Sequence, residues 1–428
     1  MSERKPSRRG FLKAAALAPV MAQLATARRA LGDELAGLGE RTAAQGLGAS
    51  LASSYRLDPS ITYLNHGSIG TIPRAIQQAH RKYLEICETN PWVHMWGEAW
   101  KEPLQQVRNQ AASMLCCDAS EVAFTHNTTE AFNLLANGLP LAAGDEVLFS
   151  SLNHTGASAC WHHMAEVRGF TVREFDFPLR EVPHLTADDV VGIYREQIRP
   201  ETRVLVFTHV DNQVGLRHPV KELAAAARER GVQFVAVDAA QTVGMIPLDV
   251  AAMGVDVYAT SPHKWLQAPK GLGLVYVRQE IQDNLRPMWV TWGQARYRGT
   301  ARIYEDYGTR NLPEVLSLGD AIDFQQQLDE SNKEHHHRRL WEAARSAVAE
   351  SPRLRWRSPT TWRLSAALYS IEPIGESSRA VFERLYSRHG YVFRPFEIEG
   401  LNAVRLSPNV MNTRGQIAEV LAKVAEKG

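Results

Sequence analysis

The sequence predicts an α/β protein, with a large domain on a mostly parallel sheet followed by a smaller α+β domain. Short apolar runs alternate with amphipathic helical stretches between residues 120 and 278. These runs are continuously apolar, as in strands that are buried on both faces of a sheet. Positive and negative charges nearly cancel, with 48 Lys+Arg against 47 Asp+Glu, so no nucleic-acid partner is expected.

The expected strands are the apolar runs of this alternating region. They are residues 122–126, 146–150, 203–209, 234–238, 257–260 and 272–277. Amphipathic helices fit between several of them, for example residues 220–231, where Gly231 is the stop signal. Ligands of such sheets bind beyond the C-terminal ends of the strands, so we expect the functional site at that edge.

The flanking segments complete the predicted domain organisation. A helix fits residues 74–88, and a long helical stretch runs to about residue 349. Near the end, Thr413 precedes Gln416 by three positions, which is the spacing of a capping box. We expect the following parts: a leader over 1–27, an N-terminal segment over 28–70 that joins the small domain, a large domain over 71–320 and a small domain over 321–428.

The first 27 residues have the layout of an export signal. Residues 7–13 read "SRRGFLK" and lead into an Ala-rich apolar run that is too short and weak to span a membrane. Ala25 and Ala27 give a small-x-small cleavage site. The paired arginines resemble the twin-arginine type, which predicts export to the periplasm by the twin-arginine translocase. The alternative is a basic amphipathic helix that is retained.

Two strand ends carry groups that suit a phosphate and a flat ring. After the first strand, Thr128 and Thr129 open a helix, whose N-terminal N–H groups and added hydroxyls favour an anion. The alternative is ordinary capping by Asn127 or Thr128. After the second strand, His154 could stack on a ring or transfer a proton, or it could be an ordinary loop histidine.

Two further strand ends supply a carboxylate and an amine. Asp238 closes an apolar run, where a lone carboxylate is unfavourable and needs a cationic partner. Lys264 follows a later strand together with Ser261 and His263, which are further phosphate donors. An amine, a carboxylate, a ring-stacking group and a phosphate cup together predict pyridoxal 5′-phosphate (PLP) as cofactor. Singly, each of these side chains could be structural or solvated.

A metal centre is not expected. His335, His336 and His337 are consecutive, and on a helix their side chains point about 100° apart, so they cannot all reach one ion.

Taken in order, these segments resemble the class V aminotransferases, PLP-dependent enzymes of fold type I, over residues 60–424. The most specific segments are "DAAQTVG" from Asp238 and "SPHKWLQAPKGLG" from Ser261. Four further segments agree: "NTTEAFN", "THVDNQVG", "GTRNLPEVLSLGDAIDF" and "VRLSPNVMNT".

The resemblance implies a role for each site residue. Lys264 would hold the cofactor covalently and act as the base, His154 would stack on its ring and Asp238 would pair with its ring nitrogen. Asn212 and Gln241 would lie near the ring hydroxyl. The phosphate would be held by Thr128, Thr129, Ser261 and His263, with Thr309 reaching the phosphate of a neighbouring subunit, which implies a homodimer. Arg405 would grip the α-carboxylate of a substrate, the alternative being a surface ion pair.

Within the family, "YLNHGSIG" looks like the isopenicillin N epimerase-like branch, which would place Asn65 and His66 at the substrate. Cysteine desulfurases are related, but residues 390–408 lack the nucleophilic cysteine that they carry before the arginine. A chain of this family that carries a twin-arginine signal resembles the periplasmic aminotransferase-like enzymes of pyoverdine maturation. Those enzymes act on the glutamate side chain of a siderophore peptide.

The expected activity is therefore an exported, aminotransferase-like PLP enzyme that acts on an amino-acid-type or siderophore substrate. Epimerisation is the first alternative, and it needs a second acid that the sequence does not position. A C–S lyase is another alternative. An exported protein that kept the fold and lost turnover is an alternative of a different class.

Overall fold

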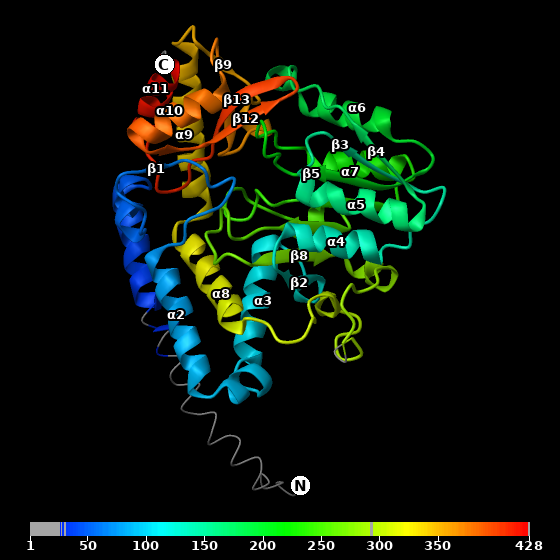
Figure 1. Cartoon of the computed structure of the whole chain (residues 1–428). Helices are drawn as coiled ribbons and strands as arrows, with labels where there is room; N and C mark the ends of the chain where they lie inside the picture. The colour runs from blue at the N-terminus through cyan, green and yellow to red at the C-terminus, as the bar shows by residue number, and fades with distance from the viewer. Residues whose placement is uncertain (1–25, 27, 30, 292–293, 427–428) are drawn as a thin grey trace, which may run out of the picture.

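A seven-stranded sheet forms the centre of the large domain in the computed structural model, which describes residues 26, 28–29, 31–291 and 294–426 (Figure 1). The strand order is β2-β8-β7-β6-β5-β3-β4. Only β8 runs antiparallel to its neighbours, so the predicted, mostly parallel α/β architecture is confirmed. The strands are β2 (Val122–Thr125), β3 (Glu146–Ser150), β4 (Thr171–Phe175), β5 (Thr202–Thr208), β6 (Phe234–Asp238), β7 (Val257–Thr260) and β8 (Gly273–Val277).

The predicted strands agree with the observed ones to within one residue at each end. Strand β4, at the edge of the sheet, was not among the predicted strands. Its sequence, "TVREF", is mostly exposed or half-buried and has no continuous apolar run. An edge strand with one neighbour therefore lacked the signal that identified the buried strands.

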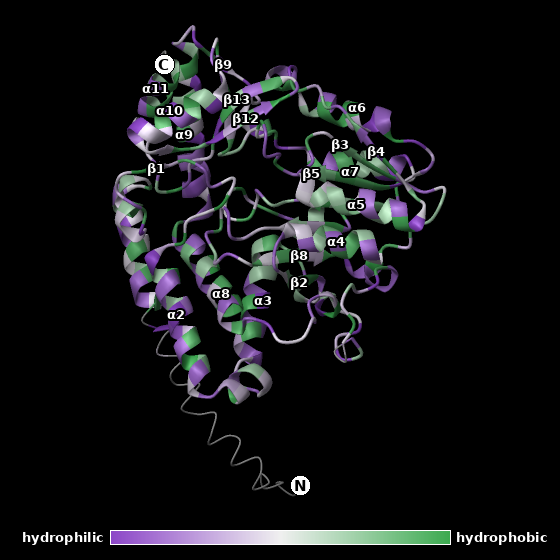
Figure 2. Ribbon diagram, viewed as in Figure 1, coloured by the Kyte–Doolittle hydropathy of each residue, from purple (hydrophilic) through white to green (hydrophobic). Residues whose placement is uncertain are grey.

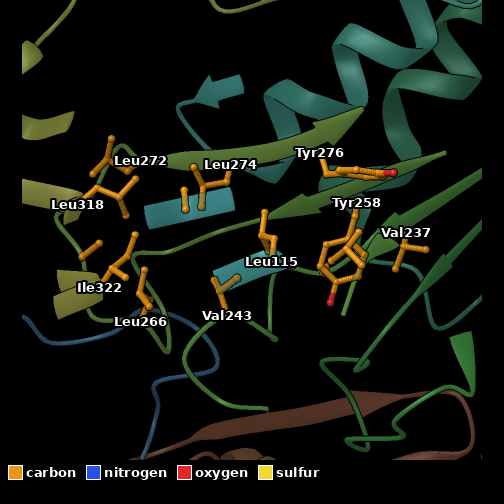
Figure 3. Packing of buried hydrophobic residues seen from close by; sticks show 14 of the residues in the cluster. Leu115, Val237, Val243, Tyr258, Leu266, Leu272, Leu274, Tyr276, Leu318 and Ile322 are labelled. Atoms are coloured by element: carbon orange, nitrogen blue, oxygen red, sulfur yellow. The ribbon is translucent and has the colours of Figure 1, made fainter. Parts of the chain in front are cut away.

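Both faces of the sheet are buried, and each strand divides its side chains between two apolar clusters. In β6, Val235 and Val237 belong to the cluster shared with α3 and α8, whereas Phe234 and Ala236 belong to the cluster shared with α4 and α5. Figure 3 shows the first cluster, in which residues of β6, β7 and β8 gather with residues of α3 and α8. The apolar colouring of the central strands in Figure 2 reflects this two-sided burial.

Helices cover the two faces of the sheet. On one side lie α4 (Thr128–Gly138) and α5 (Thr155–Arg168). On the other side lie α2 (Arg74–Thr89), α3 (Lys101–Leu115), α6 (Ala187–Gln197), α7 (Val220–Glu229) and α8 (Leu312–Gln327). Helix α2 confirms the helix predicted over 74–88. Ile76, Tyr83 and Ile86, which follow helical spacing, are buried on its inner face.

The long helical stretch predicted up to residue 349 is two helices rather than one. Helix α8 ends before Leu328, and α9 (Glu330–Ala349) begins after Asp329, which has a left-handed φ of 61° and caps α9 by accepting from Asn332 N–H. Helix α8 packs on α2 and α3, whereas α9 packs on α11 and β9. The boundary expected at 320/321 lies inside α8, and the backbone changes direction at Asp329.

The small domain is an antiparallel sheet with three helices. Its strand order is β12-β13-β10-β9. The strands are β9 (Leu354–Trp356), β10 (Tyr369–Pro373), β12 (Arg394–Ile398) and β13 (Leu401–Leu406). Helices α9, α10 (Ser378–His389) and α11 (Arg414–Ala425) supply its apolar core. Thr413 and Gln416 form the predicted capping box at the start of α11.

The segment between 28 and 70 contacts both domains. Residues 31–45 are helical, and Leu31, Leu35 and Leu38 are buried in the core cluster of the large domain. Strand β1 (Thr62–Tyr63) then pairs in parallel with β11 (Tyr391–Val392) of the small domain. The segment expected to join the small domain therefore contacts that domain through β1, while its helical part packs on the large domain.

The predicted export signal over 1–27 lies outside the described residues, apart from position 26. Among the helices of the described residues, none is both long and apolar enough to cross a membrane. Short helical segments connect the main elements of the described residues: η1 (Ala49–Ser54), η2 (Trp92–Trp96), η3 (Ala119–Glu121), η4 (Val182–His184), η5 (Ala251–Met253), η6 (Gln279–Asn284), η7 (Ala301–Tyr304) and η8 (Trp362–Leu364).

Candidate active site

The first component of the site is a cup of donors at the start of α4. Asn127 caps this helix, since its side chain accepts a hydrogen bond from Glu130 N–H, as expected for ordinary capping. Thr128 nevertheless turns its hydroxyl toward Ser261, with 2.8 Å between the two oxygens, and its N–H lies 3.3 Å from the same Ser261 oxygen. Two hydroxyls and the N–H groups of a helix start converge here, which fits a phosphate.

The start of α5 approaches this cup closely. A Cβ atom on Gly156 would lie only 2.5 Å from Thr129 Oγ1, so the glycine permits the two helix N-termini to meet. His154 caps α5 by accepting from Gly156 N–H at Nδ1, 3.0 Å away. Because Nδ1 accepts, the neutral ring carries its proton on Nε2. Burial, with Lys264 and Arg405 nearby, lowers the pKa of His154, while Asp238 opposes the shift.

Asp238 supplies a buried carboxylate at the end of β6. It accepts one hydrogen bond, from Ala240 N–H at 3.0 Å, and no Lys or Arg of the described residues lies within ion-pair distance. Burial raises the pKa of Asp238, while the Ala240 N–H and the charges of Lys264 and His154 oppose the rise. A carboxylate in this setting is stabilised by a cationic group of a ligand, such as a protonated ring nitrogen.

Lys264 lies in the turn after β7, and its backbone N–H donates to Ser261 O. Within the described chain, its amine has no hydrogen-bond partner. Burial lowers the pKa of Lys264 to about 8, an effect that Arg405 reinforces and Asp238 opposes. Such an amine is partly neutral near pH 7–8 and can react with a carbonyl group.

The Lys264 turn is held in place by Gly70. Gly70 N–H donates to His263 O at 2.9 Å, and a Cβ at Gly70 would lie 2.0 Å from Lys264 O. The segment around 65–70 therefore closes over the backbone of the lysine, and only a glycine fits at this contact.

The other residues expected at the cofactor lie around the same edge. His263 has its Nδ1 3.3 Å from Leu272 O, which leaves Nε2 available. Gln241 donates to Gly67 O and accepts from Trp265 Nε1–H, so this amide also ties the 65–70 segment to the lysine turn. Asn212 offers its backbone carbonyl to Arg405, and no hydrogen bond of its side chain is seen among the described residues.

Arg405 is a buried guanidinium on β13, with 2% of its surface exposed. It donates to Asn212 O, Asn65 Oδ1 and Ser68 Oγ, each at 2.8 Å. All three acceptors are neutral, and within the described residues no carboxylate lies within ion-pair distance of it. Its Nε–H finds no hydrogen-bond partner in the part of the chain that the structure describes. Burial lowers the pKa of Arg405 to about 9. The arrangement fits an anionic ligand and does not fit the surface ion pair considered as the alternative.

Of the two residues expected near the substrate, Asn65 accepts a hydrogen bond from Arg405, whereas His66 packs near the rings of Tyr63 and Trp265. His66 is completely buried, and neither ring nitrogen has a hydrogen-bond partner in the described chain. Its ring meets the edge of Tyr63 at 5.1 Å between centroids. Burial lowers the pKa of His66 to about 3, so the ring is neutral.

Thr309 is exposed on the loop after η7, and no contact of its hydroxyl is found among the described residues. The loop is anchored by a buried ion pair: Arg108 Nη2 lies 2.6 Å from Glu305 Oε1, and Glu305 also accepts from Phe124 N–H. An exposed threonine on an anchored loop is available to a second molecule.

The three consecutive histidines diverge on α9, as expected. His335 is exposed, His336 is half-buried and His337 is buried. In the described part of the chain, no cluster of three potential metal ligands is found.

Ser68 and Asp211 also belong to this site, although neither was predicted from the sequence. Ser68 contacts Arg405. Asp211 is completely buried, and its carboxylate accepts N–H groups from residues 213, 214 and 216, which shapes the loop beside Asn212. Burial raises the pKa of Asp211 to about 6. Its place in "THVDNQVG" was a usable signal, because a buried aspartate in a turn caps backbone N–H groups.

Comparison with known proteins identifies this arrangement. The profile of the aminotransferase class-V family matches residues 62–385. The chain belongs to the class V aminotransferase family. The chain is 30% identical to isopenicillin N epimerase of Amycolatopsis lactamdurans over 394 residues, which cover 88% of this chain and 98% of the epimerase. It is also 30% identical to a cysteine desulfurase of Klebsiella pneumoniae over 315 residues, 69% of this chain and 74% of the desulfurase.

Solved structures confirm the PLP fold type I architecture. The cystine C-S lyase C-DES, in complex with its product cysteine persulfide, superimposes with a TM-score of 0.78 at 22% identity, covering 86% of this chain and 98% of the lyase. A cysteine desulfurase of Escherichia coli gives a TM-score of 0.75 at 23% identity, covering 88% and 97%.

The class V protein described here is therefore a PLP-dependent enzyme, and its own residues fit the cofactor. The Thr128–Ser261 cup suits the phosphate, the buried Asp238 carboxylate suits the ring nitrogen, and the unpartnered Lys264 amine suits the aldehyde.

Proposed function

We propose that the enzyme moves a proton at Cα of an amino-acid-type substrate, in an aminotransferase-like reaction. The observation that carries this proposal is the buried Arg405, which has neutral acceptors and no carboxylate partner among the described residues. An α-carboxylate held by Arg405 would orient Cα relative to Lys264, whose charge environment includes Arg405.

When bound, PLP supplies a protonated ring that withdraws electrons from Cα. Asp238 keeps the proton on the ring nitrogen, because its buried carboxylate is stabilised by that positive charge. Lys264 Nζ holds the cofactor at rest and, when freed, removes the Cα proton as a general base. The pKa of about 8 keeps a sizeable fraction of this amine unprotonated near neutrality.

Epimerisation is the second candidate, and it is supported by the 30% identity that extends over 98% of an isopenicillin N epimerase. It differs in returning the proton to the opposite face of Cα, which needs an acid there. Desulfurase chemistry through a persulfide is disfavoured, since residues 390–408 contain no cysteine. C–S lysis remains a further alternative, supported by the fold shared with a cystine C-S lyase.

The substrate and location are part of the proposal. The "SRRGFLK" segment supports export to the periplasm through the twin-arginine translocase. Export and the family together support a siderophore peptide of the pyoverdine type, modified at its glutamate, as substrate. Replacing Arg8 and Arg9 by lysine should retain the protein in the cytoplasm, which cell fractionation measures. Continued periplasmic recovery of the double variant would contradict this route.

We also propose a homodimer in which Thr309 of each subunit reaches the phosphate cup of the other. The exposure of Thr309 and its lack of partners in the described chain support this arrangement. Light scattering measures the assembly. Mixed dimers of a Thr309→Val chain and a Lys264→Ala chain test the contact. If Thr309 acts in the site of the other subunit, one site contains both substitutions and the other contains neither. Half of the cofactor sites should then be intact. A monomer would contradict the proposal.

The reaction is tested by its products. Incubation with amino acids in deuterium oxide should give exchange at Cα together with a 2-oxo acid, as mass spectrometry detects. Exchange with inversion and no oxo acid would favour epimerisation instead. Borohydride reduction followed by peptide mapping should label Lys264, and Lys264→Ala should remove both label and turnover. Lys270→Ala is a matched control, because Lys270 lies on the same segment and should keep both.

A further inference from the structure

Two arginines lie directly opposite each other on adjacent strands of the small domain. Arg394 of β12 and Arg405 of β13 are register partners in an antiparallel pair. Residues in this relationship project from the same face of the sheet, and like charges placed there are unfavourable. Strands β12 and β13 lie side by side in the upper part of Figure 1. Arg405 donates a hydrogen bond to Asn212 O, on the loop after β5.

Both guanidinium groups approach one aromatic ring. The central carbon of Arg394 lies 5.7 Å from the centroid of Phe396, and that of Arg405 lies 5.5 Å from it. The charges of both arginines also act on His154, the residue expected to stack on the cofactor ring. Burial, Lys264 and both arginines lower the pKa of His154. The two arginines therefore lie on one face of the small-domain sheet, and the charges of both act on His154.

Neither arginine is neutralised by the protein within the described residues. Ion pairs there involve neither Arg394 nor Arg405, although Arg394 is exposed and able to reach a carboxylate. The nearby acid Asp211 is occupied by three backbone N–H groups from residues 213–216. Glu397, three positions after Arg394 on β12, pairs instead with Arg379. Two cations on one face thus lack anions.

We propose that the substrate carries two anionic groups, an α-carboxylate held by Arg405 and a second, side-chain carboxylate held by Arg394. This inference rests on the proposed function, in which the site takes an amino-acid-type substrate. A planar guanidinium binds a carboxylate through two parallel hydrogen bonds, so Arg394 would select an acidic side chain over its amide. The alternative is that Arg394 is a solvated surface cation with no ligand.

Carboxylates that lack an amino group cannot react, so they test binding by Arg394 and Arg405 without turnover. Calorimetry of the holoenzyme gives the dissociation constants of glutarate and butyrate, which differ by one carboxylate. We expect glutarate to bind about tenfold or more tightly than butyrate. Arg394→Gln should bring this ratio close to one and leave butyrate unchanged, whereas Arg394→Lys should keep part of the preference. Arg388→Gln, which removes an exposed charge from α10, is the matched control and should keep the full ratio.

The outcomes separate this inference from the proposed function. Equal binding of glutarate and butyrate, or a preference that survives Arg394→Gln, overturns the second carboxylate site. Titration with glutamate and with glutamine, followed through the absorbance of the cofactor, tests the same preference with amino-acid substrates. A preference for glutamine overturns the inference. If neither amino acid changes the absorbance while the glutarate preference stands, the dianion site is supported and the proposed amino-acid reaction is contradicted.

Discussion

The hydroxyl oxygens of Thr128 and Ser261 lie 2.8 Å apart, although 133 positions separate the two residues in the chain. Thr128 follows β2 and Ser261 follows β7, and β8 lies between these strands in the sheet. Both strands run antiparallel to β8, so they are parallel to each other and their C-terminal ends lie at the same edge of the sheet. The phosphate cup forms at this edge, where the segments that follow the two strands meet.

Ser261→Ala removes one hydroxyl from this cup and leaves the N–H and hydroxyl of Thr128. We expect the dissociation constant for PLP to rise about tenfold or more, since a hydrogen bond to a charged group contributes roughly 1.5–3 kcal/mol. Fluorescence titration of the apoenzyme measures it. Ser387→Ala, on the outside of α10, is the control. Pyridoxal without phosphate should bind both proteins alike. Unchanged PLP affinity would contradict the role of Ser261.

The rate of covalent PLP attachment should depend on pH through Lys264. With a pKa of about 8, the neutral fraction of the amine rises by about tenfold between pH 7 and pH 9 and then levels off. Stopped-flow absorbance of the apoenzyme mixed with PLP measures this rate. A rate that still rises steeply above pH 10 would show that the amine is not shifted.

The same shift predicts how stability depends on pH. The unfolded lysine keeps its proton to about pH 10.4, so between about pH 8 and this value the unfolded state binds more protons than the folded state. The free energy of unfolding of the apoenzyme should therefore rise over this window because of Lys264. Urea denaturation of wild type and Lys264→Met isolates the effect, since the variant should lack this rise. Parallel curves for the two proteins would refute it.

Gly70→Ala should disturb the lysine turn, because the new methyl group would lie 2.0 Å from Lys264 O. We expect a loss of roughly 1–3 kcal/mol in unfolding free energy and weaker PLP attachment, as measured by urea denaturation and cofactor absorbance. Gly192→Ala in α6 is the control, since nothing lies within 4 Å of its Cβ position and alanine favours helix. It should be neutral or slightly stabilising. A fully stable Gly70→Ala enzyme would count against the close contact.

Arg108→Leu should strongly destabilise the large domain. It leaves the Glu305 carboxylate buried without its closest partner, which lies 2.6 Å away. We expect the free energy of unfolding, measured by urea denaturation, to fall by about 2–4 kcal/mol. When Glu305 is also replaced by leucine, the double variant should lose less than the sum of the losses of the two single variants. The exposed pair Arg338–Glu342, at 3.0 Å, is the control, and Arg338→Leu should change stability by less than about 1 kcal/mol. Equal effects would contradict the role of burial.

The sequence predicted the parts of the fold that depend on continuous apolar runs and on local signals. Strands such as β6, and the capping box at Thr413, could be located because the residues that define them are adjacent in the chain. The exposed edge strand β4 could not be located from the sequence, because it lacks a continuous apolar run. The break at Asp329 could not be located either, because it depends on which domain each of the two helices packs against.

The same distinction holds at the site. Lys264 and Asp238 stand in segments with recognisable order, whereas the relation of Arg394 to Arg405 depends on the register of two strands. No spacing in the sequence gives that register. The contact of Ser68 with Arg405 likewise arises only when β1 pairs with β11 and draws the segment beside the small domain.

The bond between Arg405 and Asn65 Oδ1 joins residues 340 positions apart. On the ribosome, Asn65 emerges long before Arg405 is synthesised, while Thr128 and Ser261 are both already available at an intermediate stage. The phosphate cup and Lys264 thus precede Arg405 in the chain, so the residue proposed to bind the substrate carboxylate is the last of these groups to be synthesised.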